Sequence, residues 1–330
     1  MKPTPTTWKV VRRIVFRSIG VIVGLTLLWF GGHVVEWVTG IRILPWNPYA
    51  FCGDSESGPL PDTVRVGLYE EFPNPWRLEK LNQIDFPVTL AIAARSQEEF
   101  LQQSIAIRQQ YPQVREVYYW PQLAYEEGYY LGTWSDAAAI QRVAQDIDEL
   151  PVLWDLEMPL NKSYISAQSW PHNRQFLDQW FSERTEKVYI WRTHTGMGLN
   201  PLFLRLLAMH YDPLDYPQVS LHLDLYTSGA GLSEQQMKNI LHCGVDRYQE
   251  RFIPSLGVLN DGEAAADIFV PPETLQRDLR LVREAGITEV WFFGVNGLND
   301  AYLSAIKDTL PLETLPARAG YSTEQTILAK

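Results

Sequence analysis

The chain has 330 residues, 12 Trp and a formal net charge of −11, from 28 Lys and Arg against 39 Asp and Glu. This acidic balance argues against nucleic acid as a partner. The two cysteines, Cys52 and Cys243, have neither metal-ligand spacing nor the CxxC pattern, which argues against a cysteine-based metal or redox site.

The N-terminus has the pattern of a membrane-targeting segment. Residues 1–17 contain basic side chains and no acid, and an apolar stretch follows over residues 18–38. A positive flank before such a stretch predicts a single-pass transmembrane signal anchor, with the N-terminus cytoplasmic and the remaining chain extracytoplasmic, that is, periplasmic or extracellular. A cleaved signal peptide is the alternative, although no small-x-small site follows the apolar core. Residues 39–61 are rich in Pro, Gly and Ser and are predicted to form a linker.

Over residues 62–311, strand-like runs alternate with amphipathic helix-like runs. The predicted strands are 64–69, 88–94, 114–120, 152–156, 188–193, 219–226, 245–250 and 289–295. Helical runs such as 96–110, 135–150 and 273–286 begin at Ser or end at Gly, as capped helices do. Eight such units in about 250 residues predict a (β/α)8 TIM barrel, followed by a polar tail over 312–330. A doubly wound open sheet is the alternative, but no GxGxxG follows an early strand.

The sixth predicted strand alternates between apolar and polar side chains. Its apolar set should face the surrounding helices and its polar set should face the barrel interior. Buried polar groups are costly unless they are paired or functional, so this strand predicts either an internal hydrogen-bond network or a site. The polar set consists of Ser220, His222, Asp224 and Tyr226.

The segment PVLWDLEMP, residues 151–159, places two carboxylates at the end of the fourth predicted strand. Asp155 and Glu157 are two residues apart, so in a strand they project to one face while Trp154 projects to the other. Paired acids of this kind suit proton transfer at a glycosidic bond. The structural alternative is two solvated or helix-capping acids in a loop.

Active sites of TIM barrels lie at the C-terminal ends of the strands. Besides the strand-four acids, the candidate site residues at these ends are Arg95, Trp120, Asp224, Tyr226 and Glu250. The loop after strand three adds aromatic residues that either line a carbohydrate cleft or pack on one another, namely Tyr125, Tyr129, Tyr130 and Trp134. There is no HExxH motif, zinc-ligand spacing or GxSxG elbow, so we expect no metal, no cofactor and no serine-hydrolase chemistry.

The DLE tripeptide at the end of strand four resembles the DxE end of the motif of family 18 glycoside hydrolases, the chitinase-like family. That family is also similar in having a Tyr on a polar sixth strand, here Tyr226, and a Trp on strand eight, here Trp291. The resemblance implies that Glu157 protonates the glycosidic oxygen. It further implies that Asp155 orients the substrate's own N-acetyl group as the nucleophile, with Tyr226 and Asp224 holding that group.

The family's longer DxxDxDxE pattern would require acids at Leu150 and Leu153. A second interpretation resembles retaining barrel glycosidases, which carry a glutamate on strand four and another on strand seven. Glu157 would then be the acid/base and Glu250 the nucleophile, with carboxyl groups about 5–5.5 Å apart. Leu156 stands where those enzymes have an asparagine.

Together these patterns predict a membrane-anchored, extracytoplasmic barrel that acts on a glycan, with Glu157 as general acid assisted by Asp155. The predicted partners are a carbohydrate and, through the N-terminal helix, the membrane. The alternative is a non-catalytic glycan-binding or scaffold barrel. A phosphodiester-cleaving barrel would need histidines beside Glu70 and Glu71, and the sequence has none there.

The two cysteines support a further expectation. Cys52 precedes predicted strand one and Cys243 precedes predicted strand seven, so both should lie at the N-terminal face of the barrel. In an exported domain the compartment permits a disulfide between them. Two free thiols are the alternative.

Overall fold

Eight parallel strands close into a barrel in the computed structural model of the chain, which describes residues 59–147, 149–159, 168–193, 204–205, 209–227, 231–259 and 269–315. Each strand pairs with its neighbours in chain order, and the last strand pairs with the first. The strands are β1 (Arg65–Glu70), β2 (Val88–Ala94), β3 (Val114–Pro121), β4 (Val152–Asp155), β5 (Val188–Thr193), β6 (Val219–Asp224), β7 (Phe252–Gly257) and β8 (Glu289–Phe293). The predicted TIM barrel is confirmed.

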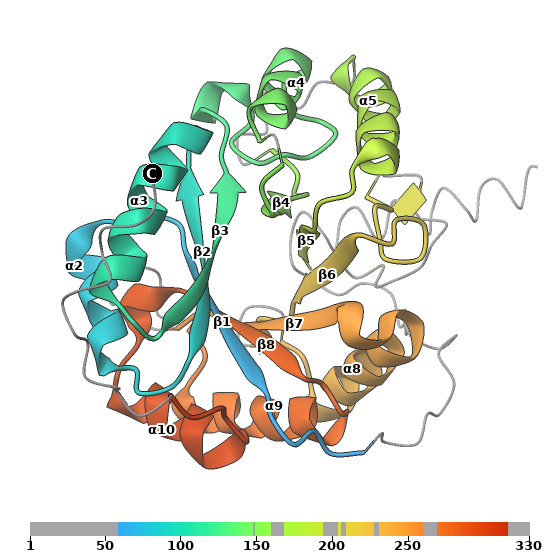
Figure 1. Cartoon of the computed structure of the whole chain (residues 1–330). Helices are drawn as coiled ribbons and strands as arrows, with labels where there is room; N and C mark the ends of the chain where they lie inside the picture. The colour runs from blue at the N-terminus through green and yellow to red at the C-terminus, as the bar shows by residue number, and fades with distance from the viewer. Residues whose placement is uncertain are drawn as a thin grey trace, which may run out of the picture. The chain divides into compact units, whose positions relative to one another are not determined.

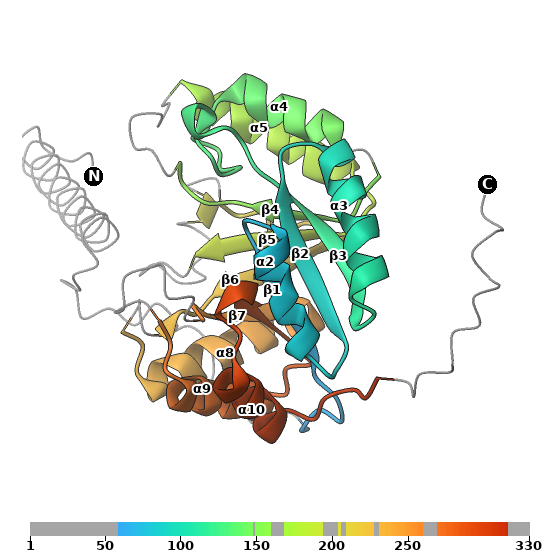
Figure 2. The ribbon, with the colours of Figure 1, turned by 90° about the vertical axis from the view of Figure 1, so that its left-hand side faces the viewer.

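Helices lie outside the strands (Figure 1), and a view turned by 90° shows α3, α4 and α5 on one side of them and α8, α9 and α10 on the other (Figure 2). The α-helices are α2 (Pro75–Leu78), α3 (Gln97–Gln110), α4 (Ala137–Asp146), α5 (Ser169–Glu183), α8 (Glu234–Tyr248), α9 (Pro272–Glu284) and α10 (Asp300–Thr309). Short 3-10 helices are η1 (Glu79–Gln83), η2 (Tyr125–Glu127), η4 (Gln249–Arg251) and η5 (Val295–Gly297).

The helix caps follow the sequence signals closely. Ser96 caps α3 by accepting a hydrogen bond from the Glu99 backbone N–H at 3.2 Å. The cap of α4 is Asp136 rather than Ser135, because the Ser135 hydroxyl donates instead to the Tyr130 carbonyl at 2.7 Å. After α9, Gly286 adopts the left-handed conformation that favours glycine, with φ of 76°.

The predicted seventh strand, residues 245–250, is wrong. Those residues are the last turn of α8 and the start of η4, and the strand is Phe252–Gly257. Val245 and Tyr248 continue the helical spacing of the buried residues of α8, so the apolar residues that suggested a strand belong to a helix. The true strand contains Pro254 and ends at Gly257. Both residue types are unfavourable in strands, so the sequence pattern did not predict a strand there.

Aromatic rings fill the interior of the barrel. The Tyr69 ring stacks on the Trp191 ring with centroids 4.4 Å apart, and it also contacts the Trp291 ring at 4.8 Å. Trp120 packs on Trp191 at 4.7 Å. Gly67 makes room for the large indole of strand eight, since a Cβ at this position would lie 2.0 Å from Trp291 Cδ2. The core therefore occupies the barrel axis and leaves polar groups to its two ends.

The predicted alternation of β6 is confirmed on its inward face. His222 is fully buried, and its Nδ1 lies 2.5 Å from the Tyr69 hydroxyl, which also lies 2.8 Å from Ser255 Oγ. Ser220 and Asp224 are buried on the same side of the strand. His222, Tyr69 and Ser255 thus form an internal hydrogen-bond network, which was one of the two expectations, and Ser220 is not part of it.

The segments flanking the barrel bear on the predicted domain limits. The predicted anchor, 18–38, lies outside the described residues, and within the described part of the chain no helix is long and apolar enough to cross a bilayer. Leu312, the first residue of the predicted tail, forms a parallel bridge with Val64 at the start of β1. Cys243, buried in α8, is disulfide-bonded. Cys52, the other cysteine of the chain, lies outside the described residues.

Candidate functional site

The end of β4 has the side-chain arrangement that the sequence predicts. Trp154 projects outward, where it packs on Trp180 of α5 at 4.7 Å and donates its indole N–H to the Leu131 carbonyl at 3.0 Å. Asp155 projects into the barrel and is buried. Glu157 follows the strand and is half-buried, so it reaches solvent while remaining next to Asp155.

The loop after β3 holds this end of β4 in place. Its Leu131 N–H donates to the Asp155 carbonyl at 2.9 Å. Gly132 lies against the backbone of Glu157, and a Cβ there would be 1.9 Å from the Glu157 carbonyl oxygen. On the other side, the Thr193 hydroxyl at the end of β5 donates to Glu157 Oε1. The position of Glu157 is therefore determined by two neighbouring segments as well as by its own strand.

Asp224 of β6 joins Asp155 inside the barrel. Burial raises the pKa of Asp155 well above its usual value, and the charges of Glu157, Asp224 and Glu71 raise it further. Burial likewise raises the pKa of Asp224, with a further rise from Glu157, although Asp224 accepts a hydrogen bond from the Trp191 indole. The two aspartates share one low-dielectric space, which disfavours full ionisation of both.

Glu157 and Glu71 complete a group of four carboxylates, which we call the acid cluster (Glu71, Asp155, Glu157 and Asp224). Burial raises the pKa of Glu157 to about 7, and the charge of Glu71 contributes to the rise. Burial also raises the pKa of Glu71, although hydrogen bonds from Tyr129 at 2.5 Å and Gln122 at 3.4 Å lower it. No ion pair joins the cluster to a Lys or Arg within the described residues.

Tyrosines surround the acid cluster. Two of the four loop aromatics, Tyr129 and Tyr130, face it. Tyr129 donates to Glu71, and the pKa of Tyr130 is raised by burial and then by the charges of Asp155, Glu157 and Glu71. Tyr226 lies next to Asp224, whose charge, after burial, raises the pKa of its hydroxyl. The other two loop aromatics lie elsewhere: Trp134 packs on Trp170, and Tyr125 is exposed.

Three polar atoms around the cluster lack a normal hydrogen bond to any residue in the described ranges. They are Asp155 Oδ1, Trp120 Nε1 and the Tyr226 hydroxyl. The Trp120 indole N–H is nevertheless directed toward Asp155 and the Tyr226 hydroxyl toward Asp224, where each lowers the pKa of the carboxyl group. Because buried polar atoms are normally well paired, these imperfect internal contacts are ones that a ligand can replace. The three atoms, one acceptor and two donors, suit the hydroxyl and amide groups of a sugar.

Three predicted site residues do not join this group. Trp291 is buried in the barrel interior, and its indole N–H donates to Glu289 at 2.8 Å, toward the N-terminal end of β8. Arg95 is exposed beyond β2, and its backbone N–H donates to Glu99. Glu250 lies in η4 before β7, at the opposite end of the barrel from Glu157, so the predicted strand-four and strand-seven carboxylate pair does not form.

Sequence reasoning missed several members of the site. Glu71 follows β1 directly and was considered at this strand end, but it was not included among the glycan-site candidates. Thr193 is the last residue of β5, so the rule that collects residues at strand ends could have selected it. Trp191 lies two residues before Thr193 on the same face, and its inward position follows from strand alternation. Nothing in the sequence indicated which tyrosine of the loop after β3 would contact Glu71.

The acid cluster does not have the geometry of a metal site. Across the described ranges no group of three or more His, Cys, Asp or Glu side chains is arranged to hold a metal ion.

Comparisons with known proteins add little to this geometry. No family model matches the chain, and no curated protein matches it. Similar solved structures include a 3-keto-D-glucoside 4-epimerase from E. coli (13% identity, TM-score 0.45, 74% of this chain and 98% of that one). Another is a broad-specificity GH5-4 endoglucanase from Clostridium longisporum (12% identity, TM-score 0.44, 75% of this chain and 97% of that one). A third is a chitinase from Chromobacterium violaceum (12% identity, TM-score 0.43, 74% of this chain and 98% of that one). At these identities and TM-scores the matches carry no argument about function, which has to come from the site.

Proposed function

We propose that the barrel is a glycoside hydrolase, with Glu157 as the general acid. The observation that carries this proposal is the pKa of Glu157, raised to about 7 on a side chain that still reaches solvent. A carboxyl group with such a pKa keeps its proton near neutral pH and can transfer it to a glycosidic oxygen. After bond cleavage the carboxylate can take a proton from water, which completes the cycle.

Asp155 and Asp224 act on the substrate rather than on the leaving group. The Asp155 carboxyl group, whose Oδ1 lacks a well-aligned hydrogen bond, can accept one from the N–H of a 2-acetamido group, which is the role that the family 18 resemblance implies. That family's inner acid is absent, because Leu153 fills the corresponding position in the core. Asp224 supplies a second carboxylate from β6 instead, since its charge raises the pKa of Asp155. Substrate-assisted catalysis thus uses two carboxyl groups that share a proton, Asp155 from β4 and Asp224 from β6.

We further propose that the barrel is exported and held at the membrane by residues 18–38. The basic flank before the apolar segment supports this orientation. The disulfide at Cys243 supports an oxidising compartment, since disulfides persist mainly outside the cytosol. Protease treatment of intact cells tests this point: the barrel should be degraded from the extracytoplasmic side, and complete protection after opening of any outer membrane would contradict it.

The test of the catalytic proposal is Glu157→Gln in the full-length protein. Turnover should be measured on chromogenic N-acetylglucosamine and glucose oligosaccharides, with oligosaccharide binding measured in parallel. Loss of the general acid should lower turnover by about 10²–10⁴-fold while binding persists. Glu98→Gln is the matched control, because Glu98 is exposed on α3 and should leave the rate unchanged. Unchanged turnover in Glu157→Gln would exclude the mechanism.

One observation favours a second candidate, a glycan-binding barrel without hydrolytic activity. Inward positions on β7 carry Ser255 and Gly257 rather than an acid, so within the described residues this strand supplies no carboxylate nucleophile. In that case the wild-type protein would bind oligosaccharides through the acid cluster and release no product, and Glu157→Gln would change affinity alone.

A further inference from the structure

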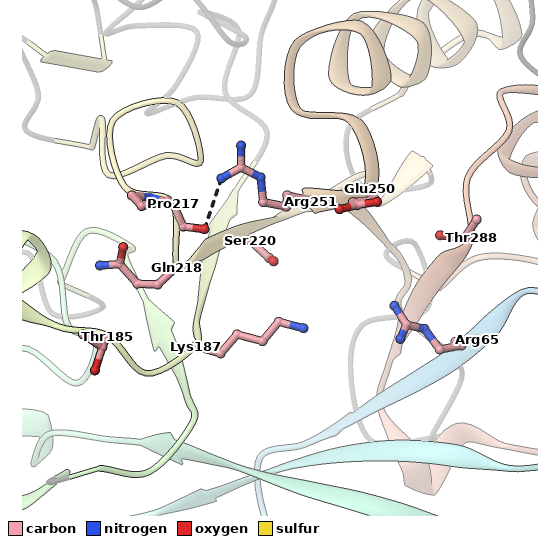
Figure 3. Close-up of a pocket in the computed structure, with 9 residues that line it drawn as sticks. All are labelled: Arg65, Thr185, Lys187, Pro217, Gln218, Ser220, Glu250, Arg251 and Thr288. Carbon is pink, nitrogen blue, oxygen red and sulfur yellow. Dashed lines mark hydrogen bonds between the residues drawn. The ribbon is translucent and has the colours of Figure 1, made fainter.

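The N-terminal end of the barrel contains a cavity of about 420 Å³, opposite the acid cluster. This volume is within the range of small-molecule sites. Its lining residues (Figure 3) come from the N-terminal parts of β1 and β6 and from the segments that precede β5, β6, β7 and β8. They are Arg65, Thr185, Lys187, Pro217, Gln218, Ser220, Glu250, Arg251 and Thr288.

The charge of this lining is opposite to that of the chain. Three of the nine residues are cations and one is an acid, in a protein of net charge −11. Arg251 donates to the carbonyls of Pro213 at 2.7 Å and Pro217 at 3.2 Å. These acceptors orient the guanidinium without neutralising it. Arg65 forms an ion pair with Glu289 at 2.6 Å, and its side chain remains 60% exposed. For the other two cations no ion pair exists within the described part of the chain.

Lys187 points its ammonium group into the cavity (Figure 3). The ammonium lies 4.5 Å from the centre of the Tyr189 ring, and it makes no hydrogen bond or ion pair to a residue in the described ranges. Partial burial lowers the pKa of Lys187; Glu289 and Glu116 raise it, and Arg65 lowers it. Lys187 is exposed to solvent, and its contact with the Tyr189 ring leaves the ammonium group available to an anion.

Ser220 provides an uncharged donor beside this cation. Its side chain lines the cavity from the inward face of β6 and is only 5% exposed. Its hydroxyl has no hydrogen bond to a described residue. A buried free hydroxyl and a free ammonium aimed at one space form the donor set that binds the oxygen atoms of an anion.

We propose that this cavity binds a small oxyanion, a phosphate- or carboxylate-bearing metabolite, held by Lys187 and Ser220 with Arg251 and Arg65 at its edge. Glu250 at the edge restricts the site to compact anions by repelling extended negative charge. The site is separate from the acid cluster, and its occupancy does not depend on glycan chemistry.

The test is calorimetric titration of the full-length protein with inorganic phosphate, glucose 6-phosphate and malonate, each against chloride at equal ionic strength. Saturable binding of at least one of the three is expected. Preference for the phosphates or for malonate would distinguish the two anion classes. Lys187→Met should weaken binding by about tenfold or more, as expected for loss of a charge-assisted hydrogen bond. Lys238→Met, on the outside of α8, is the control.

Thr185→Glu is a second variant for the case in which Lys187→Met folds poorly. Thr185 is exposed, so the substitution leaves the core untouched and adds a repelling carboxylate to the cavity edge. It should also weaken anion binding. The proposal is overturned if the wild type binds none of the three anions, or if both variants bind them as tightly as the wild type. Glu157→Gln should bind the anion normally, which keeps this result independent of the proposed hydrolase activity.

Discussion

The two ends of this barrel differ in the sign of their unpaired charge. At the C-terminal end, four carboxylates form no ion pair with a described cation, and burial raises their pKa values, although the charge of Arg77 lowers that of Glu71. At the N-terminal end, Lys187 and Arg251 have no carboxylate partner among the residues that the structure describes, while the buried Glu289 accepts hydrogen bonds from Arg65 and Trp291. Uncompensated charge is costly in a folded protein and marks places where a ligand can supply the missing partner. An aromatic core between the ends keeps the two sets apart.

The largest effect should come from disturbing that core. In Gly67→Ala the new Cβ would lie 2.0 Å from Trp291 Cδ2, so the indole has to move. Because Trp291 also donates to Glu289 and contacts Tyr69, both ends should be affected. We expect the free energy of unfolding to fall by about 3 kcal/mol, measured by urea denaturation.

Gly294→Ala is the matched control for this change, because the nearest atoms to its Cβ are 3.5 Å away, an ordinary contact. If Gly67→Ala were as stable as Gly294→Ala, the Trp291 indole would not be rigidly packed in the core between the two ends of the barrel.

At the N-terminal end, removing a negative charge should destabilise the protein. Glu289→Gln removes the partner of Arg65 and the nearest compensation for Lys187 while keeping an oxygen for the Trp291 indole. Since Arg65 is largely exposed, we expect a loss of about 1–2 kcal/mol in urea denaturation. Glu313→Gln, from an exposed pair with Arg115, should change stability by less than about 0.5 kcal/mol. An equal loss in both variants would show that Glu289 has no special role.

At the C-terminal end, by contrast, removing a negative charge should stabilise the protein. The folded pKa of Asp155 is raised, so the folded state binds more protons than the unfolded chain, and stability falls as pH rises. Asp155→Asn should therefore stabilise the protein at about pH 8 by on the order of 1 kcal/mol and have little effect near pH 4. Thermal unfolding at the two pH values measures this. Destabilisation at pH 8 would mean that Asp155 is compensated by a charge outside the described residues.

The smallest effect concerns the pH profile of turnover. Because Glu157 must be protonated and has a pKa of about 7, activity should decline above that pH. Glu71→Gln removes a negative charge that raises this pKa, so the alkaline limb should move to lower pH by less than about one unit. The exposed neighbour Glu126 is the control, through Glu126→Gln. If the alkaline limb of the profile stayed in place or moved to higher pH, Glu71 would not be a source of the raised pKa of Glu157.

Much of the fold could be predicted because each local pattern agreed with the barrel. Strands β2 and β5 have the predicted bounds, and the other confirmed strands differ at their ends by one or two residues. The single failure, β7, occurred where a helix continued to Tyr248 and the strand contained Pro254 and Gly257. There the pairing with β6 and β8 overrides the weak propensity of the segment.

The sequence by itself determined that Asp155 and Glu157 share a strand face and that this face opens at the C-terminal end of a TIM barrel. Strand alternation and the order of the elements are sufficient for both conclusions. Only the tertiary structure decided which other charges meet them. Glu71 and Asp224 lie near Glu157 because barrel closure joins strands that are far apart in the chain. Glu250 lies at the opposite end because it precedes the true seventh strand instead of ending it.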